Sequence, residues 1–403
     1  MIDHRKLGRE LELFDSDPLA GAGLPFWLPA GAAARHAVEE YLRDLERRNG
    51  YQHVVSPPLG RPELFRLSRH LEHFAEDMFP ALSSAGDDQL MLRPSLCPHH
   101  ALVYRARGRS HRELPLRIAE IGQMFRAERS GVLGGLSRVR VIALNDGHTF
   151  CAPDQVVDEV GRELRLIRQA HQALGVRVSG VRLSLRDGSG RFIDDDAMWA
   201  RAEEVLRCAL KDAGVGYEDA PGEAAFYGPK IDIQVRDDAG REQTLSTVQV
   251  DYDKPQRFDL SYAAADGSRQ VPVMIHRSLA GSMERLFAHL IEVHAGAFPA
   301  WYSPVQLAVL PVAPDHDAAA REMLSAVAGL RAELWAEGSL GARIRQAALR
   351  RIPYVGIIGD REASAGQVAL RLRDGRELPA QGVPQALDRI GRVIDLQSSD
   401  LLG

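Results

Sequence analysis

The stretch that most constrains the fold is residues 118–151, IAEIGQMFRAERSGVLGGLSRVRVIALNDGHTFC. Two extended segments, 123–128 and 138–150, flank the turn-rich sequence SGVLGG, which predicts two strands joined by a flexible loop. Side chains at alternate positions of a strand point to the same face. One face of the second strand therefore carries two cationic, two apolar and two further polar side chains: Arg138, Arg140, Ile142, Leu144, Asp146 and His148.

This predicted face has positive charge at one end and an aspartate with a histidine at the other. Arg126 shares a face of the first strand with Glu128, and Ile142 lies roughly 13 Å from Asp146 at about 3.3 Å per residue. A ligand with phosphate at one end and a small polar group at the other would fit such a face. Alternatively, the arginines pair with carboxylates on a half-buried strand, and this stretch alone leaves both interpretations open.

The composition indicates an ordinary globular protein. The chain has 403 residues, 45% of them hydrophobic and 26% charged, which is long enough for two domains. The net charge of −5 gives no overall basic field, so we expect no DNA partner, although a local basic patch could bind RNA. No signal core and no apolar run of about 18 residues is present, so we expect a cytoplasmic protein without a membrane partner. Three cysteines are too few for a disulfide framework.

Before and after the central stretch, the pattern predicts helices and an edge segment. Helical spacing of apolar residues predicts a helix over 32–48, and a second amphipathic segment covers 63–79. Between them, the strand-like YQHVVSPPL contains Pro57 and Pro58, so it belongs to a sheet edge or an interface. Cys97, just before a proline, would be a core residue in most proteins. Two further helices are predicted over 153–174 and 194–213.

Candidate ligand-binding residues recur in the second half of the chain. Residues 222–253 alternate apolar and polar side chains around a DDAG turn, which predicts an antiparallel hairpin. The loop before it offers Tyr227 and Lys230 for hydrogen bonding, although such loop residues are usually only solvated. Residues 271–294 pass from a strand with His276 near its end into an apolar helix containing Arg285, which needs an anionic or aromatic partner.

A boundary near 296–306 divides the chain into a first domain of residues 1–300 and a second of residues 305–403. The second domain alternates strands and helices, with helices expected over 315–337 and 342–350, a hairpin over 367–378 and a last helix from Pro384. This order predicts an α/β unit of about 100 residues with a mixed sheet. A basic cluster in it could meet phosphates or form a solvated helix face: Arg343, Arg345, Arg350 and Arg351.

Four segments together resemble a known family: FRAERSG, RVR, NDGHTFC and VMIHRSLAGSMER. They look like motifs 2 and 3 of class II aminoacyl-tRNA synthetases, specifically of threonyl-tRNA synthetases, and the resemblance runs from FWLPAG to LRRIPYVGIIGDRE. It implies an α+β fold with an antiparallel catalytic sheet flanked by helices, followed by a C-terminal α/β domain of the anticodon-binding type. It also implies a homodimer with the Pro57 region at the interface. We expect a compact form without the family's N-terminal ubiquitin-like and editing domains.

The resemblance implies ATP-dependent activation of threonine and its transfer to tRNA(Thr). Arg126 would hold the α-phosphate and the amino acid's carboxylate, Arg285 would stack on adenine and reach the terminal phosphate, and Mg²⁺ would accompany ATP. A planar, permanently charged guanidinium suits both tasks. These two arginines are the catalytic candidates, and the residues expected around ATP are Arg126, Glu128, Arg138, Gln249 and Arg285.

The resemblance also implies a zinc site and an amino-acid pocket. Cys97, His148 and His276 match the family's three zinc ligands and leave the fourth position for the substrate. Asp146 would accept a hydrogen bond from the threonine hydroxyl, with Tyr227 and Lys230 lining the pocket. Such a site rejects valine by roughly 10⁴- to 10⁵-fold, whereas serine lacks one methyl worth about 1–3 kcal/mol, so we expect measurable serine activation.

Several positions depart from the family pattern. Ile142 stands where the family stacks a phenylalanine on adenine, Leu144 replaces a pocket glutamine, and Gly134 replaces a loop histidine. Losing one aromatic face would weaken base binding by about 1–3 kcal/mol. Residues 337–339, Glu-Gly-Ser, replace the Asn-Glu-Lys segment expected near the anticodon. Two alternatives therefore remain: a paralogue that transfers the activated amino acid to another acceptor, such as a carrier protein, and a non-catalytic tRNA-sensing module.

Overall fold

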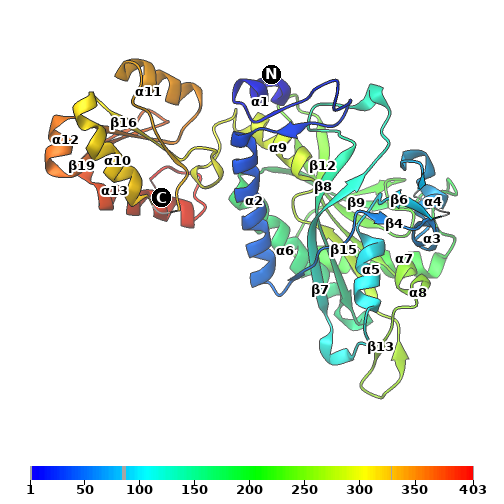
Figure 1. Cartoon of the computed structure of the whole chain (residues 1–403). Coiled ribbons are helices and arrows are strands. Elements are labelled where there is room, and N and C mark those ends of the chain that lie inside the picture. Colours follow the sequence, from blue (N-terminus) through cyan, green and yellow to red (C-terminus); the bar gives the residue numbers. More distant parts are fainter. Residues whose placement is uncertain (1, 84–87, 328, 403) are drawn as a thin grey trace.

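The computed structural model describes residues 2–83, 88–327 and 329–402 and contains two main sheets (Figure 1). The larger has eight strands in the order β10-β9-β11-β12-β15-β8-β7-β3. Neighbours run antiparallel except at the two edges, where β10 pairs with β9 and β3 with β7 in parallel. Its strands are β3 (Gln52–His53), β7 (Leu116–Phe125), β8 (Val141–Cys151), β9 (Val178–Leu185), β10 (Glu218–Pro221), β11 (Lys230–Arg236), β12 (Glu242–Asp251) and β15 (Val273–Ser278).

Helices cover both faces of this sheet. Side chains of α2, α6, α7 and α9 join one large hydrophobic core with β8, β11, β12 and β15. On the opposite face, α5 packs through Ala101 and Tyr104 on Ile118 and Phe150. This confirms the predicted antiparallel sheet flanked by helices. The helices around it are α1 (His4–Glu10), α2 (Pro29–Arg48), α3 (Pro62–Leu67), α4 (His70–His73), α5 (Cys97–Arg105), α6 (Val156–Leu174), α7 (Asp196–Asp212), α8 (Asp253–Arg257) and α9 (Met283–Val293).

Three small strand groups decorate this part of the chain, and they differ from the predicted segments. The segment 51–59 lies at a sheet edge, as predicted, but it forms only the two-residue strand β3 before Pro57 and Pro58, and its last residue, Leu59, begins β4. The segment 63–79 breaks into α3, α4 and a 3₁₀ turn because Arg69 between the two helices adopts φ of +60°. The additional strands are β1 (Phe14–Asp15), β2 (Phe26–Trp27), β4 (Leu59–Gly60), β5 (Leu82–Ser83), β6 (Gln89–Leu92), β13 (Tyr262–Ala263) and β14 (Arg269–Gln270).

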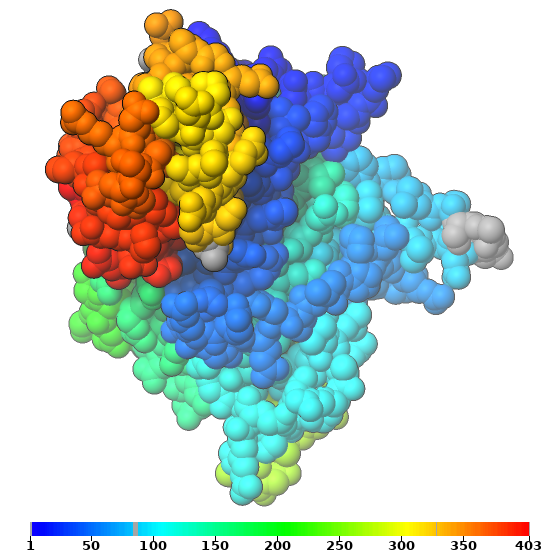
Figure 2. Space-filling view, turned by 60° about the vertical axis from the view of Figure 1, so that its left-hand side comes forward, coloured from blue at the N-terminus to red at the C-terminus, as the bar shows by residue number. Residues whose placement is uncertain are grey.

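The C-terminal part builds a mixed five-stranded sheet with its own hydrophobic core, as predicted. The strand order is β17-β16-β18-β19-β20, with β16 parallel to both of its neighbours. Figure 2 shows this part packed against the N-terminal segments, and the Tyr41 and Trp301 rings meet there at 5.0 Å. Its elements are β16 (Leu307–Pro311), α10 (Asp317–Ala326), β17 (Ala332–Leu334), α11 (Leu340–Leu349), β18 (Tyr354–Ile358), α12 (Asp360–Ala365), β19 (Gln367–Leu372), β20 (Glu377–Gly382) and α13 (Val383–Asp395).

One prediction for this part was wrong, and one alternative holds for only part of its residues. The helix expected over 315–337 ends at Ala326, because Gly329 adopts φ of +80° and Ala332–Leu334 pairs with β16 instead. The basic cluster is not entirely a solvated helix face. Arg343 is buried and donates to the main-chain oxygens of Pro311 and Trp335, both at 2.7 Å, so it ties α11 to the sheet.

The central pair of strands also differs in extent from the prediction. β7 and β8 pair antiparallel from Leu116 opposite Phe150 to Phe125 opposite Val141. Arg138 and Arg140 therefore precede the ladder rather than lying on it, whereas Asp146 and His148 share one face of β8 as expected. Within the described ranges, no helix combines the length and the apolar character that crossing a bilayer requires.

Candidate active site

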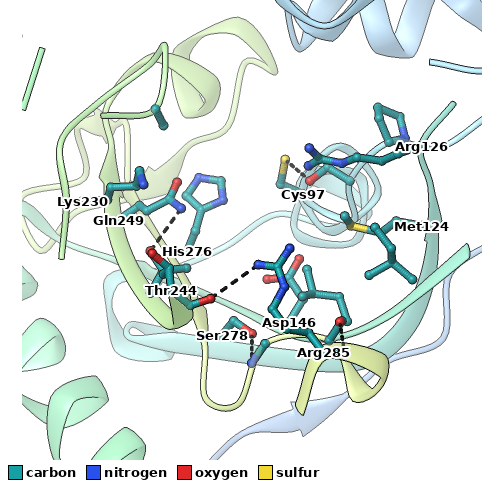
Figure 3. A pocket seen from close by; sticks show the side chains of 18 of the residues that line it. Cys97, Met124, Arg126, Asp146, Lys230, Thr244, Gln249, His276, Ser278 and Arg285 are labelled. Atoms are coloured by element: carbon teal, nitrogen blue, oxygen red, sulfur yellow. Dashed lines mark hydrogen bonds between the residues drawn. The ribbon is translucent and has the colours of Figure 1, made fainter. Parts of the chain in front are cut away.

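A cavity of about 500 Å³ opens over the large sheet (Figure 3). Its walls come from β7 and β8, β11 and β12, β15, the start of α9 and the loop before β11. Eleven side chains from these distant segments were predicted to bind ligands, and the fold brings all but His148 to the cavity wall. Those at the wall are Cys97, Arg126, Glu128, Arg138, Asp146, Tyr227, Lys230, Gln249, His276 and Arg285.

Two arginines of the cavity have no carboxylate partner among the residues that the structure describes. Arg126 follows β7, where its main-chain N–H donates to the Arg140 oxygen at 2.9 Å and its guanidinium lies over the Phe74 ring at 5.6 Å. Its Nε is shielded from solvent and has no hydrogen-bond partner among the described residues, and burial lowers the pKa of Arg126. Within the described ranges, the Arg285 guanidinium donates to the main-chain oxygens of Ser137 and Thr244, both at 3.4 Å. Such cations suit an anionic ligand.

Two other arginines of the central stretch, Arg138 and Arg140, are already occupied. Arg138 forms an ion pair with Glu128 at 2.7 Å, and Arg140 donates to the Glu128 main-chain oxygen at 2.9 Å. The two interpretations of this stretch therefore each hold for part of it. Arg138 is paired with a carboxylate, whereas Arg126 is available to a phosphate.

Three potential metal ligands converge beside the cavity. The sulfur of Cys97 and one nitrogen each of His148 and His276 lie within 4.8 Å of one another. Pairing of β15 with β8 sets His276 directly opposite His148, and their Nδ1 and Nε2 atoms face each other at 2.9 Å. Cys97 comes from the first turn of α5, and burial raises the pKa of its thiol to about 11. One sulfur and two imidazole nitrogens around one point fit Zn²⁺ with one position left open.

Asp146 lies next to this cluster on β8. Its Oδ1 is 3.9 Å from Nε2 of His148, and burial raises the pKa of the Asp146 carboxyl to about 7. A buried carboxylate at this place would gain from a ligand that donates a hydrogen bond.

The remaining nominated residues form a hydrogen-bonded wall. The Tyr227 hydroxyl donates to Gln249 Oε1, and the Tyr227 ring lies 5.1 Å from that of His276. Lys230 pairs with Asp232 at 2.5 Å, a partner that the sequence did not suggest. Ile142 and Leu144 also line the cavity, so both departures from the family pattern face the ligand space.

Sequence reasoning missed an aromatic group at the cavity wall. His70, Phe74 and Phe226 all line the cavity, and the His70 ring meets Phe226 edge to face at 6.2 Å. Desolvation lowers the pKa of His70 well below its ordinary value, and its Nδ1 lies 2.7 Å from Ser68 Oγ. For His70 and Phe74 the sequence offered only the amphipathic pattern of 63–79, which does not distinguish a wall residue from a core residue.

Comparison with known proteins agrees with this geometry. Residues 81–294 match the tRNA synthetase class II core domain (G, H, P, S and T), and residues 306–390 match an anticodon binding domain. Proteins named threonine--tRNA ligase from Listeria welshimeri and Halalkalibacterium halodurans are 46% and 44% identical over 376 and 396 residues. These alignments cover 92% and 97% of this chain but 58% and 61% of the relatives, so the chain spans about three fifths of their length.

Solved structures give the same assignment. The RNA binding domain of threonyl-tRNA synthetase from Cryptosporidium parvum Iowa II superposes with a TM-score of 0.92 at 32% identity, covering 97% of this chain and 98% of that one. A putative threonyl-tRNA synthetase from Aeropyrum pernix follows with a TM-score of 0.84 at 27% identity, over 99% and 96% of the two chains. The chain therefore belongs to the class II tRNA synthetases and, within them, to the threonyl-tRNA synthetase family.

Proposed function

We propose that this chain activates threonine with ATP and transfers the threonyl group to tRNA(Thr). The observation that carries the proposal is the meeting, at one cavity, of a sulfur and two imidazole nitrogens with two arginines that pair with no carboxylate of the described residues. The first group suits zinc and an amino acid with a β-hydroxyl, and the second suits the phosphates of a nucleotide. The family assignment supports the same reaction.

Amino-acid selection would depend on Cys97, His148 and His276 as zinc ligands with Asp146 beside them. When bound, the zinc would supply a Lewis-acidic position for the amino and hydroxyl groups of threonine. Asp146 would accept a hydrogen bond from the hydroxyl, and valine would leave this buried carboxylate unpaired. Unpaired buried groups of this kind give discrimination of roughly 10⁴- to 10⁵-fold. Tyr227 and Lys230 would line the rest of the amino-acid pocket.

Adenylate formation would rest on positioning and charge stabilisation. The threonine carboxylate oxygen attacks the α-phosphorus in line, the bond from that phosphorus to the bridging oxygen breaks, and pyrophosphate leaves with its negative charge. Arg126 would hold the α-phosphate, and Arg285 would hold the terminal phosphate with Mg²⁺. Arg138 would join them by exchanging its present partner, Glu128, for phosphate oxygens. Gln249 would complete the wall around ATP.

Domain organisation and assembly follow the same proposal. We infer a catalytic domain over 1–300 and an anticodon-binding domain over 305–403, each with a sheet and core of its own. A homodimer is supported by β3, a two-residue strand at the edge of the large sheet, and by the nearly fully exposed side chain of Val55 beside it. The Pro57 region would then lie at the interface.

The proposal is tested by amino-acid-dependent ATP–pyrophosphate exchange, followed by aminoacylation. We expect exchange with threonine, weaker exchange with serine and none above background with valine, and we expect the exchange with threonine and serine to be lost after zinc chelation. Incubation of the chain with labelled threonine and either tRNA(Thr) or candidate carrier proteins then identifies the acceptor. If no amino acid supports exchange, the proposed activation is contradicted. If a carrier protein is labelled and tRNA(Thr) is not, the proposed acceptor is contradicted.

A further inference from the structure

We infer that hydrogen-bonded groups behind His148 and His276 hold both imidazoles in the tautomer that turns a nitrogen lone pair toward the zinc position. The inference rests on the proposed zinc site and adds four positioning residues to it. An imidazole binds a metal only through an unprotonated nitrogen, and the partner of its other nitrogen decides which nitrogen that is. The four residues form two series of hydrogen bonds, called here hydrogen-bond chains: His100 with Glu120, and Asp251 with Lys254.

The hydrogen-bond chain behind His276 is short. Nε2 of His276 lies 3.0 Å from Oδ2 of Asp251, and a carboxylate can only accept, so this nitrogen carries the hydrogen. Nδ1 of His276 is then the unprotonated nitrogen, and it is the atom that faces His148. Lys254 holds the same Asp251 oxygen at 2.9 Å.

Asp251 is fixed by more than this lysine. Its other oxygen, Oδ1, accepts the main-chain N–H groups of Asp253 and Lys254, each at 2.9 Å. The carboxylate is fully buried and uses both oxygens as acceptors at once. It can therefore neither turn nor offer a hydrogen to His276.

The hydrogen-bond chain behind His148 has one more link. Nδ1 of His148 lies 2.7 Å from Nδ1 of His100, and Nε2 of His100 lies 3.2 Å from Oε2 of Glu120. Because the Glu120 carboxylate only accepts, the hydrogen of a neutral His100 is on Nε2 and its Nδ1 accepts. His148 must then donate from Nδ1, which leaves Nε2 unprotonated toward His276.

Glu120 decides which atoms of this hydrogen-bond chain donate and which accept. Ser56 Oγ donates to the same Oε2 at 2.6 Å, and the buried Arg93 donates to Oε1 at 3.1 Å. Pairing of β7 with β8 also places Glu120 opposite Asp146, so the carboxylate is built into the same sheet as the ligands. Both hydrogen-bond chains therefore end in a carboxylate that the fold itself holds.

Three substitutions separate this positioning role from simple packing. In His100→Leu the acceptor for His148 is lost, and we expect zinc affinity to fall by about 10- to 100-fold. In His100→Asn the amide oxygen takes the place of Nδ1, so affinity should return toward the wild-type value. In Asp251→Asn the amide oxygen stays on the main-chain N–H groups and its NH₂ faces His276, which forces the wrong tautomer and a loss of about 10- to 100-fold.

The experiment measures zinc affinity of the full chain by competition with a chromophoric chelator, with the thiolate-to-cobalt absorption of the Co²⁺-loaded protein as a second readout. His171→Leu is the matched control, because His171 is equally buried and bonded to Ser246 Oγ at 2.7 Å but belongs to neither hydrogen-bond chain. It should bind zinc as the wild type does. Thermal unfolding of each metal-free variant shows whether it is folded.

The outcomes distinguish the inference from the proposal beneath it. Wild-type protein that takes up no zinc would overturn the zinc site and the inference together. Wild-type uptake with unchanged affinity in His100→Leu and Asp251→Asn would overturn the inference alone. An equal loss in His171→Leu, or no recovery in His100→Asn, would also overturn it, because the loss would then come from packing.

Discussion

Replacing Arg126 should remove activity and stabilise the free protein at the same time. Its Nε is buried and has no partner among the described residues, and an unsatisfied buried donor costs about 1–3 kcal/mol. Methionine has a similar length and no polar atom, so Arg126→Met should raise the free energy of unfolding by about that amount. At roughly 2–4 °C per kcal/mol, the melting temperature would rise by about 2–12 °C.

The same substitution removes a cation that we propose acts on the α-phosphate. Loss of an arginine that stabilises phosphoryl-transfer charge costs roughly 10³- to 10⁵-fold in rate, so pyrophosphate exchange with threonine should fall below about a thousandth of wild type. Stability is measured by urea unfolding of the ligand-free chain, and activity by exchange at saturating threonine and ATP.

Arg117→Met is the matched control. Arg117 lies on β7 as well, but it forms a two-pronged ion pair with the buried Glu159, with both N···O distances 2.6 Å. Its removal leaves the buried Glu159 carboxylate without this partner and should destabilise the protein by about 3–5 kcal/mol, while the residues of the cavity stay unchanged. The reasoning would be refuted if Arg126→Met were less stable than wild type by the same margin, or if it kept more than a tenth of the exchange rate.

Four further predictions concern metal, nucleotide, pH and substrate. Cys97→Ser should lower zinc content measured by elemental analysis, and undiminished zinc would contradict the ligand set. Ile142→Phe should lower the KM for ATP by roughly 5- to 150-fold, equivalent to about 1–3 kcal/mol of added stacking; an unchanged KM would mean that this position does not meet the base. Burial lowers the pKa of His171 to about 4, below its unfolded value near 6.5, so the unfolded chain takes up the proton first and stability should be lost as pH falls from about 6.5 to 4, by at most about 3 kcal/mol. Urea unfolding of wild type and His171→Gln at pH 7 and 4.5 checks this, and an equal pH dependence in both would count against it. Serine should support exchange at about one tenth to one two-hundredth of the threonine efficiency in kcat/KM, and parity of valine with serine would exclude the hydroxyl-selective pocket.

Periodicity predicted the elements that bury one continuous face. The sequence predicted a strand over 138–150 and a helix over 32–48, and the structure has β8 over Val141–Cys151 and α2 over Pro29–Arg48. The helix expected over 315–337 failed because its second half is amphipathic in either conformation, and pairing of Ala332–Leu334 with β16 decides between them. A non-local contact of this kind has no local signature.

The site was predictable only in part for the same reason. Cys97, His148 and His276 are ordinary residues in their own segments, and only the family resemblance suggested that they meet. Pairing of Arg138 with Glu128 rather than with a ligand also needed the structure, because the strand that carried the argument begins after Arg138. The groups behind the histidines depend on cross-strand register, which the sequence does not state.

Register is in fact what assembles this site. On β8, Asp146 and His148 lie two residues apart and so share a face, and His276 on β15 pairs directly with His148. Gln249 on β12 pairs in turn with His276, so one row of side chains across neighbouring strands carries a zinc ligand pair and a cavity wall. A one-residue slip of β15 against β8 would turn His276 to the opposite face and put the fully buried Arg277 side chain in its place opposite His148. Because Arg277 is held on that opposite face by Glu46 at 2.8 Å, the buried ion pair disfavours the slip and fixes the register on which the metal ligands depend.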